Sequence, residues 1–302
     1  MMQFTDVHAH LETLKDLNII LLRAKEAGVS KIITCGSSLE WSRKCVELAE
    51  NGSNLVEIFA CCGIHPQDGK EEIDHFNNVI LGSEARFASE ARRATPESEI
   101  DSGQARMTKV IDRCIDELRK LAKSKKVVAI GECGLDYGVI SSKLQVITDK
   151  KFQEQLFISQ IKLAADLMLP IVVHCRNAWN DLLTILESHN KYLIKPGMFH
   201  SWTGTLADAR RAIKLGFYIS FSGIITFKNA GEIVDVAKWA PMDRILVETD
   251  SPFLTPIPLR GKQNEPKNVK MTAQFLADIR GETLEKIAEV TSENAKRLFQ
   301  FV

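Results

Sequence analysis

Six residues of types that bind divalent metal ions end or directly follow apolar runs in the sequence. Two of them, His8 and His10, come just after the apolar run at residues 4–7. On a strand, residues two positions apart point to the same face, so this pair can hold one metal ion. Four later apolar runs are followed by residues of the same kind, namely Glu132, His174, His200 and Asp250. This set predicts a site for divalent metal.

The chemistry of the six side chains narrows the choice of ions. Four histidines and two carboxylates suit Zn, Mn, Fe or Co, whereas so many nitrogens suit Mg less well. A catalytic zinc usually has three protein ligands, so we expect two divalent ions, Zn, Mn or Mg, instead of one. Glu132 is the expected bridge because its side chain is long and comes from the middle of the strand order. Asp250 is expected to bind the first ion and to accept a proton from its bound water.

The elements that must position these residues follow a regular alternation. Helical spacing of apolar residues separates the runs, as in the segments at residues 14–28, 149–167 and 179–188. Strands are predicted at residues 4–7, 31–36, 55–62, 126–131, 170–173, 197–199, 217–221 and 244–247. Two further helices are predicted near the C-terminus. The carboxyl ends of parallel barrel strands open onto one face, which would bring the six residues together.

Eight strands alternating with helices predict an α/β fold, a (β/α)8 barrel that forms a single domain over residues 1–302. The alternative is an open doubly wound sheet, which is disfavoured because no Gly-x-Gly-x-x-Gly turn follows any predicted strand. A loop insertion is expected at residues 82–106, a segment rich in Ala, Ser, Glu and Arg. We expect a solvated loop with one short helix there, and a substrate lid or partner contact is the alternative.

Composition limits the class of protein. The 39 basic residues balance the 39 acidic ones, so no overall positive field indicates nucleic acid or an acidic membrane. The seven cysteines form no Cys-x-x-Cys pair, which is typical of reduced thiols inside a cell. Neither a signal sequence nor a long apolar segment is evident. We therefore expect a cytoplasmic protein without a membrane partner, with a nuclear pool as the alternative.

Seven motifs occur in order along nearly the whole chain. They are Asp6-x-His8-x-His10, Gly63-Ile64-His65-Pro66, Gly131-Glu132-Cys133-Gly134-Leu135-Asp136-Tyr137, His174-x-Arg176, His200 with Gly204 shortly after, Glu248-Thr249-Asp250-Ser251-Pro252 and Arg260-Gly261-Lys262-x-Asn264-Glu265-Pro266. Together they resemble the TatD-type metal-dependent deoxyribonucleases of the amidohydrolase superfamily. The resemblance implies a TIM barrel, a divalent metal site and hydrolysis of DNA phosphodiesters, often from the 3′ end. It places metal ligation on the same six residues.

Five further residues are expected to contact the substrate. His65 can donate a hydrogen bond to a phosphate oxygen, and Arg176 can hold phosphate oxygens in a bidentate manner. Trp202 could stack on a base, while Arg260 and Asn264 lie in the loop after the eighth strand, where barrels often hold phosphate. Each also has a structural alternative. His65 could be a rigid structural histidine, and Arg176 could form an internal ion pair. Trp202 could be a packing aromatic, and the loop of Arg260 and Asn264 could be a structural brace.

The chain departs from the family pattern in three places. Ser201-Trp202-Thr203-Gly204 stands where Cys-Phe-Ser/Thr-Gly is usual, and Gln67 stands where another histidine is common. The segment at residues 82–106 is longer than usual. Asp136 is expected to orient its neighbours, and Glu248 to support a ligand histidine.

The leading functional hypothesis is a metal-dependent deoxyribonuclease, a 3′-to-5′ exonuclease that uses a metal-activated water. The resemblance further implies a role in DNA degradation or repair, with DNA as the partner. An alternative is an amidohydrolase-type enzyme that cleaves an ester or amide of a small molecule or an aminoacyl-tRNA. A third is a barrel retained as a scaffold, against which the intact ligand set argues.

Overall fold

The computed structural model describes residues 2–69, 96–138 and 150–301, with the backbone alone for residues 96–106. At its centre lies one sheet of eight strands in chain order, and each strand pairs in parallel with the next. The strands are β1 (Phe4–Ala9), β2 (Val29–Cys35), β3 (Glu57–Cys62), β4 (Val127–Asp136), β5 (Ile171–Arg176), β6 (Met198–Phe199), β7 (Tyr218–Phe221) and β8 (Ile245–Val247).

The last strand returns to the first. A parallel bridge joins Ala9 to Ser251, and the backbone N–H of His10 donates to the carbonyl of Ser251 at 2.8 Å. The buried carboxylate of Asp6 accepts from the backbone N–H of Thr249 at 2.9 Å and from its hydroxyl at 2.6 Å. The sheet therefore closes into a barrel, and the predicted (β/α)8 fold is confirmed in place of an open sheet.

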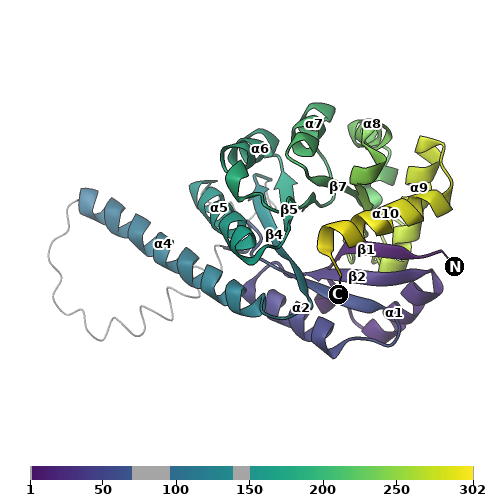
Figure 1. Ribbon diagram of the computed structural model, residues 1–302, viewed down its shortest axis with the longest axis horizontal. Coiled ribbons are helices and arrows are strands. Elements are labelled where there is room, and N and C mark those ends of the chain that lie inside the picture. Colours follow the sequence, from purple (N-terminus) through teal and green to yellow (C-terminus); the bar gives the residue numbers. More distant parts are fainter. Residues whose placement is uncertain (1, 70–95, 139–149, 302) are drawn as a thin grey trace.

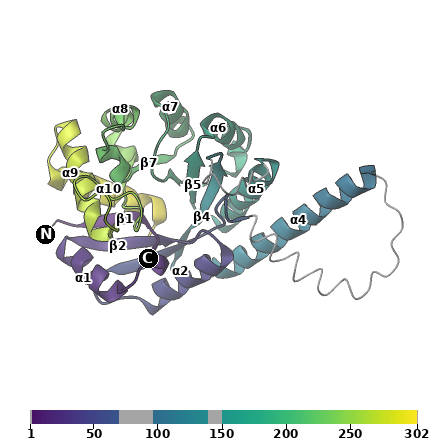
Figure 2. The ribbon, with the colours of Figure 1, turned by 180° about the vertical axis from the view of Figure 1, so that it is seen from behind.

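Helices form the outer layer (Figure 1). In both views α5 to α9 follow one another in an arc around the strands, whereas α4 extends away from the barrel (Figure 2). The α-helices of the described residues are α1 (Leu17–Glu26), α2 (Leu39–Asn51), α4 (Pro96–Leu121), α5 (Lys150–Leu167), α6 (Trp179–Ser188), α7 (Leu206–Lys214), α8 (Gly231–Trp239), α9 (Val269–Arg280) and α10 (Leu284–Phe299).

Local sequence explains where several helices begin. The Ser38 hydroxyl accepts from the backbone N–H of Trp41 at the start of α2. At the start of α7, Thr205 and Asp208 form a reciprocal capping box. Each arrangement satisfies N–H groups that a helix N-terminus leaves unpaired.

Side chains alternate between two apolar layers, as the two-residue period of a strand requires. Outward residues such as Ile32 and Ile58 pack against the helices, while inward residues such as Ile33 and Phe59 fill the barrel. Helix α10 adds Phe299 and two neighbours to the inner cluster. It also hydrogen-bonds the chain around the starts of β1 and β8, so it covers the amino ends of the strands and leaves their carboxyl ends open.

Three sequence predictions need correction. The fourth strand continues to Asp136 instead of stopping at residue 131, and α8 was not predicted. Helix α4 begins at Pro96, so residues 96–106 of the expected loop insertion are helical. The rest of that expected loop, residues 82–95, lies outside the described residues. Across the described ranges, no helix combines the length and apolarity that crossing a bilayer requires.

Candidate metal centre

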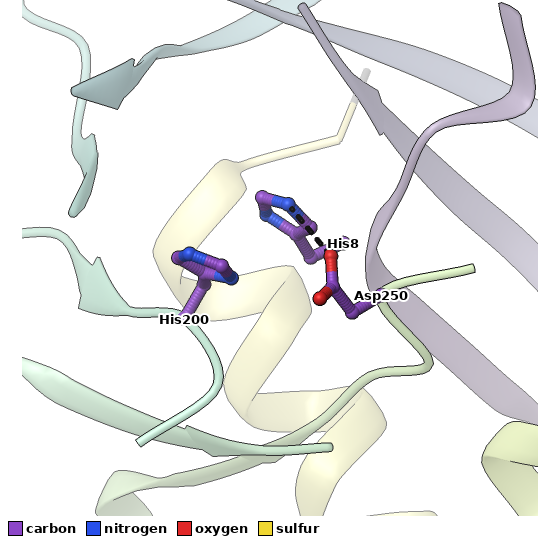
Figure 3. A group of neighbouring side chains, drawn as sticks. All are labelled: His8, His200 and Asp250. Atoms are coloured by element: carbon purple, nitrogen blue, oxygen red, sulfur yellow. Dashed lines mark ion pairs between the residues drawn. The ribbon is translucent and has the colours of Figure 1, made fainter. Parts of the chain in front are cut away.

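All six residues predicted to bind metal meet at the carboxyl ends of the strands. Five of them line a pocket of about 840 Å³, and His8 lies buried beneath them. The rings of His8 and His200 stack with their centroids 4.1 Å apart, and the Asp250 carboxylate points toward His8 (Figure 3). Strands from opposite ends of the sequence therefore contribute to one site.

The first donor set joins β1 to β8. The Nε2 atoms of His8 and His10 lie 3.3 Å apart, and they lie 3.6 and 3.4 Å from Oδ1 of Asp250. The same two nitrogens lie 3.4 and 3.7 Å from Oε2 of Glu132. A tetrahedral ion bonded at about 2.1 Å needs donor atoms roughly 3.4 Å apart. These five distances, each measured from a histidine nitrogen, match that spacing.

The second donor set uses the other oxygen of Glu132. Its Oε1 lies 2.9 Å from Nδ1 of His174 and 2.8 Å from Nε2 of His200, and these two nitrogens are 3.0 Å apart. Three donors on one face of an octahedral ion bonded at about 2.1 Å lie roughly 3.0 Å apart. Each oxygen of Glu132 thus faces its own group of nitrogens, as a bridging carboxylate would.

Hydrogen bonds fix which ring nitrogen faces the pocket. Nδ1 of His10 lies 2.8 Å from the carbonyl oxygen of Cys35, so it carries the hydrogen and Nε2 presents its lone pair to the first donor set. Nε2 of His174 lies 3.3 Å from the Asp136 carboxylate, which leaves Nδ1 for the second set. Carboxylate and carbonyl partners of this kind are typical of histidines that bind metal.

The carboxylates and imidazoles of the site shift one another's pKa values. Burial raises the pKa of Glu132, but the charges of His200 and His8 and hydrogen bonds with His174 and His200 outweigh it and hold that pKa well below its usual range. Burial lowers the pKa of His200, yet the Glu132 charge and contacts with Glu132 and Glu248 raise it well above its usual value. Carboxylates and imidazoles this close can be held together by a proton or by a metal ion.

Asp250 supplies a further test of fit. Its buried Oδ1 has no hydrogen-bond partner among the described residues, although it faces Nε2 of both His8 and His10. Burial raises its pKa, but His10, His8 and His200 beside it lower the pKa below the usual range. An ionised, buried oxygen without a hydrogen bond is costly, and a bound cation would remove that cost. The residues present fit a divalent ion.

His65 lies at the edge of the second donor set, with Nε2 3.7 Å from Oε1 of Glu132. Burial and the neighbouring His174 lower its pKa to about 3, so its ring is neutral. Its Nδ1 accepts from the backbone N–H of Gln67 at 3.2 Å, which places the hydrogen on Nε2. His65 therefore presents an N–H donor to the pocket. Gln67 also donates to Asp136 at 2.7 Å, so this departure from the family pattern braces the site.

The structure corrects the role expected of Trp202. Its side chain is fully buried, with its ring 4.2 Å from that of Trp179 and 5.4 Å from that of Phe199. The indole N–H donates to the carbonyl of Gly204 at 2.8 Å. No face of the ring is open to a base, so the prediction of base stacking is wrong and the packing interpretation holds.

The predicted phosphate contacts divide into two groups. Arg176 is exposed and lines the pocket, as expected. Asn264 is buried and donates to the carbonyls of Thr249 and Phe253 at 2.8 and 2.6 Å, so it braces the loop and the prediction of a phosphate contact is wrong. Arg260 lies over the ring of Phe227 at 3.9 Å and is absent from the described residues that line the pocket, which leaves its predicted role without support.

Sequence reasoning missed two residues of the site. Glu12 is buried, and its Oε1 lies 3.4 Å from Nδ1 of His10. Phe253 lines the pocket with its side chain exposed. Both lie two or three positions beyond a predicted ligand, a spacing that offered the only sequence signal. Glu248, expected to support a ligand histidine, does lie 3.4 Å from Nδ1 of His200.

The barrel, the cluster of ligand-type side chains and the similarities below identify a metal-dependent hydrolase. Residues 5–300 match the family model described as TatD related DNase, and the chain belongs to the TatD family. It is 36% identical over 298 residues to an uncharacterized metal-dependent hydrolase, YabD, from Bacillus subtilis, with 98% of each chain covered.

Two other similarities concern named TatD proteins. The chain is 30% identical to the 3′-5′ ssDNA/RNA exonuclease TatD of Shigella flexneri, covering 94% of this chain and 93% of that one. It also resembles the crystal structure of the TatD homologue YJJV from Escherichia coli, with a TM-score of 0.78, 26% identity and 98% of both chains covered.

Proposed function

We propose that this protein is a metal-dependent deoxyribonuclease that removes nucleotides from the 3′ end of DNA. The observation that carries the proposal is the position of Glu132, whose two oxygens face separate donor sets. Pairs of ions about 3.5–4 Å apart are typical of enzymes that cleave phosphodiesters. The name of the Shigella flexneri relative supports a nucleic-acid substrate.

Two divalent ions, Zn, Mn or Mg, would be held by the donor sets described above. When bound, such ions supply Lewis-acid stabilisation of the phosphate charge and lower the pKa of water. Asp250 would accept the proton of the attacking water, because its carboxylate is ionised and lies beside His8 and His10 of the first donor set. Because Oδ1 belongs to the first donor set, the carboxylate would lie next to a water bound there.

The scissile phosphate would be held from the β3 and β5 side of the pocket. His65 is neutral and points Nε2–H toward the donor sets, so it can donate to a non-bridging oxygen. Arg176 is exposed on the pocket wall and can add a charged contact with two N–H donors. Both groups favour an anionic substrate over a neutral ester or amide.

Metal-dependent digestion tests the proposal. Protein dialysed against chelator and reloaded separately with Zn, Mn or Mg is incubated with 5′-labelled single-stranded DNA carrying a free or blocked 3′ end. We expect a descending ladder from the free end alone, and no product without metal. Ester and amide substrates run in parallel, and their hydrolysis without DNA cleavage would favour the amidohydrolase alternative.

Asp250→Asn tests the proton acceptor. Loss of a general base lowers kcat by about 10²–10⁴-fold, while DNA binding by the variant should persist. Asp243→Asn is the matched control, because that side chain is 63% exposed and precedes β8 at the opposite end of the barrel. Near-normal kcat in Asp250→Asn would overturn the assigned role.

A further inference from the structure

We propose that Phe253 is the surface on which the nucleobase next to the cleaved phosphodiester stacks. The inference rests on the proposed nuclease function and names a contact that confers substrate binding. Phe253 follows Asp250 by three positions, lines the same pocket as the donor sets and is 56% exposed. Among the exposed large hydrophobic side chains of the described residues, Phe253 is the one that lines this pocket.

The ring is close enough to the metal ligands for one nucleotide to reach both. Its centroid lies 5.9 Å from that of His10, a member of the first donor set. The two rings are in edge-to-face contact, so the phenyl ring borders the first donor set directly. A phosphate held at the donor sets would therefore place an adjoining base beside Phe253.

Hydrogen bonds fix the loop that carries Phe253. Asn264 donates through Nδ2 to the carbonyls of Thr249 and Phe253, and its backbone N–H donates to the carbonyl of Pro252 at 3.0 Å. The backbone N–H of Phe253 donates to the carbonyl of Asp250 at 2.8 Å. These bonds fix both sides of the residue, so little conformational entropy is lost when a base stacks on it.

The backbone conformation of residues 250–254 also helps to place Phe253 in the pocket. Asp250 and Leu254, on either side of the turn, have φ values of +57° and +51°, a region that residues other than glycine seldom adopt. Such a strained backbone persists where the surrounding structure enforces it. Here it turns the chain sharply enough to bring the metal ligand and the exposed ring to the same pocket.

The charge of the chain makes stacking the more useful source of affinity. The formal net charge is zero, so long-range attraction of a polyanion is weak. Stacking on an aromatic ring is worth a factor of about 5 to 150 per base and tolerates any base. An exposed phenyl ring opposite the phosphate-binding side of the pocket thus matches what a nuclease without sequence preference needs.

A binding experiment tests the contact directly. The probe is single-stranded DNA with 2-aminopurine as its 3′-terminal base and a phosphorothioate at its last linkage, which resists cleavage. It is added to metal-loaded protein. Stacking quenches this fluorophore, so we expect quenching with the wild type and with Phe253→Trp. Phe253→Leu keeps apolar bulk without an aromatic face, and we expect it to bind with little quenching.

Kinetics with metal-loaded protein provide the second readout. Removing the 3′-terminal base from the substrate should raise KM about tenfold for the wild type, and Phe253→Ala should raise KM about tenfold for the intact substrate. The two losses should not add, because they remove the same contact. Ile194→Ala is the matched control, since that side chain is 55% exposed and is not among the described residues that line the pocket.

The outcomes separate this inference from the proposed function. Unchanged quenching in Phe253→Leu, or additive losses in KM, would overturn the stacking role while DNA hydrolysis stands. Absence of DNA hydrolysis by metal-loaded wild type would overturn both.

Discussion

Asp136 decides which nitrogen of His174 is available to the second donor set. Its Oδ2 lies 3.3 Å from Nε2 of that ring and accepts from Gln67 at 2.7 Å, so it fixes the position of two side chains. Burial raises the pKa of Asp136, but contact with His174 and the backbone N–H of Gly138 lowers it below its usual range. The carboxylate is therefore ionised and can increase the basicity of the ligand ring.

Asp136→Ala should weaken metal binding about 10- to 100-fold, because a free imidazole must be ordered before it can bind. Competition of the protein with a chromophoric chelator for zinc measures the effect. The matched control is Asp166→Ala, whose side chain is 59% exposed and pairs with Arg119 on the outer helices. Equal zinc affinity in both variants would contradict the role of Asp136.

Among individual residues, the meeting of the six candidate metal ligands at one end of the barrel was predictable, and the surroundings of the expected substrate contacts were less so. Ligands such as His174 and Asp250 lie at or just beyond strand ends, where the barrel alone sets their direction. Trp202 and Asn264 follow strands too, but the turns after those strands send both side chains into the protein. Ser201, beside the tryptophan, has a φ of +42°, a local reversal that the residue types did not indicate.

At the level of secondary structure, the spacing of apolar residues predicted the alternation of strands and helices well, and the lengths of these elements less well. Helix α6 matches the predicted range of 179–188 because its apolar residues repeat at helical spacing up to Ser188. Strand β4 was predicted too short, since Glu132 and Asp136 are polar. Asp136 pairs with Arg176 of β5, whereas Glu132 lies at an irregularity in the register. Polar side chains inside a strand are stabilised here by the site that they form.

The packing of β6 against α6 gives a prediction at this scale. Trp202→Ala removes a large side chain from between Trp179 and Phe199 and should cost about 3–5 kcal/mol of unfolding free energy. Urea denaturation measures the loss, with Trp239→Ala on α8 as a control because that ring is half-buried. A stable variant with a raised KM for DNA would instead restore the base-stacking role.

For the whole molecule, the donor sets connect parts of the chain that are distant in sequence. The first set spans β1, β4 and the end of β8, next to the bridge between Ala9 and Ser251 that closes the barrel. A cation held there would link the first strand to the last, because no loop joins them directly. Metal binding should therefore stabilise the closed barrel as a unit.

Removal of metal tests this coupling. A ligand present at 100 times its Kd stabilises the folded state by about 2.7 kcal/mol, which corresponds to a rise in Tm of roughly 5 °C for a chain of this size. We expect zinc-loaded protein to melt at least that much above chelator-treated protein in scanning calorimetry. His8→Ala should reduce the difference, because it removes a ligand of the first donor set and leaves the second set intact. His189→Ala should keep the full difference because His189 ends α6, where its Nδ1 lies 2.9 Å from the carbonyl of Ile185. An undiminished zinc-dependent rise in His8→Ala would separate barrel closure from the first donor set.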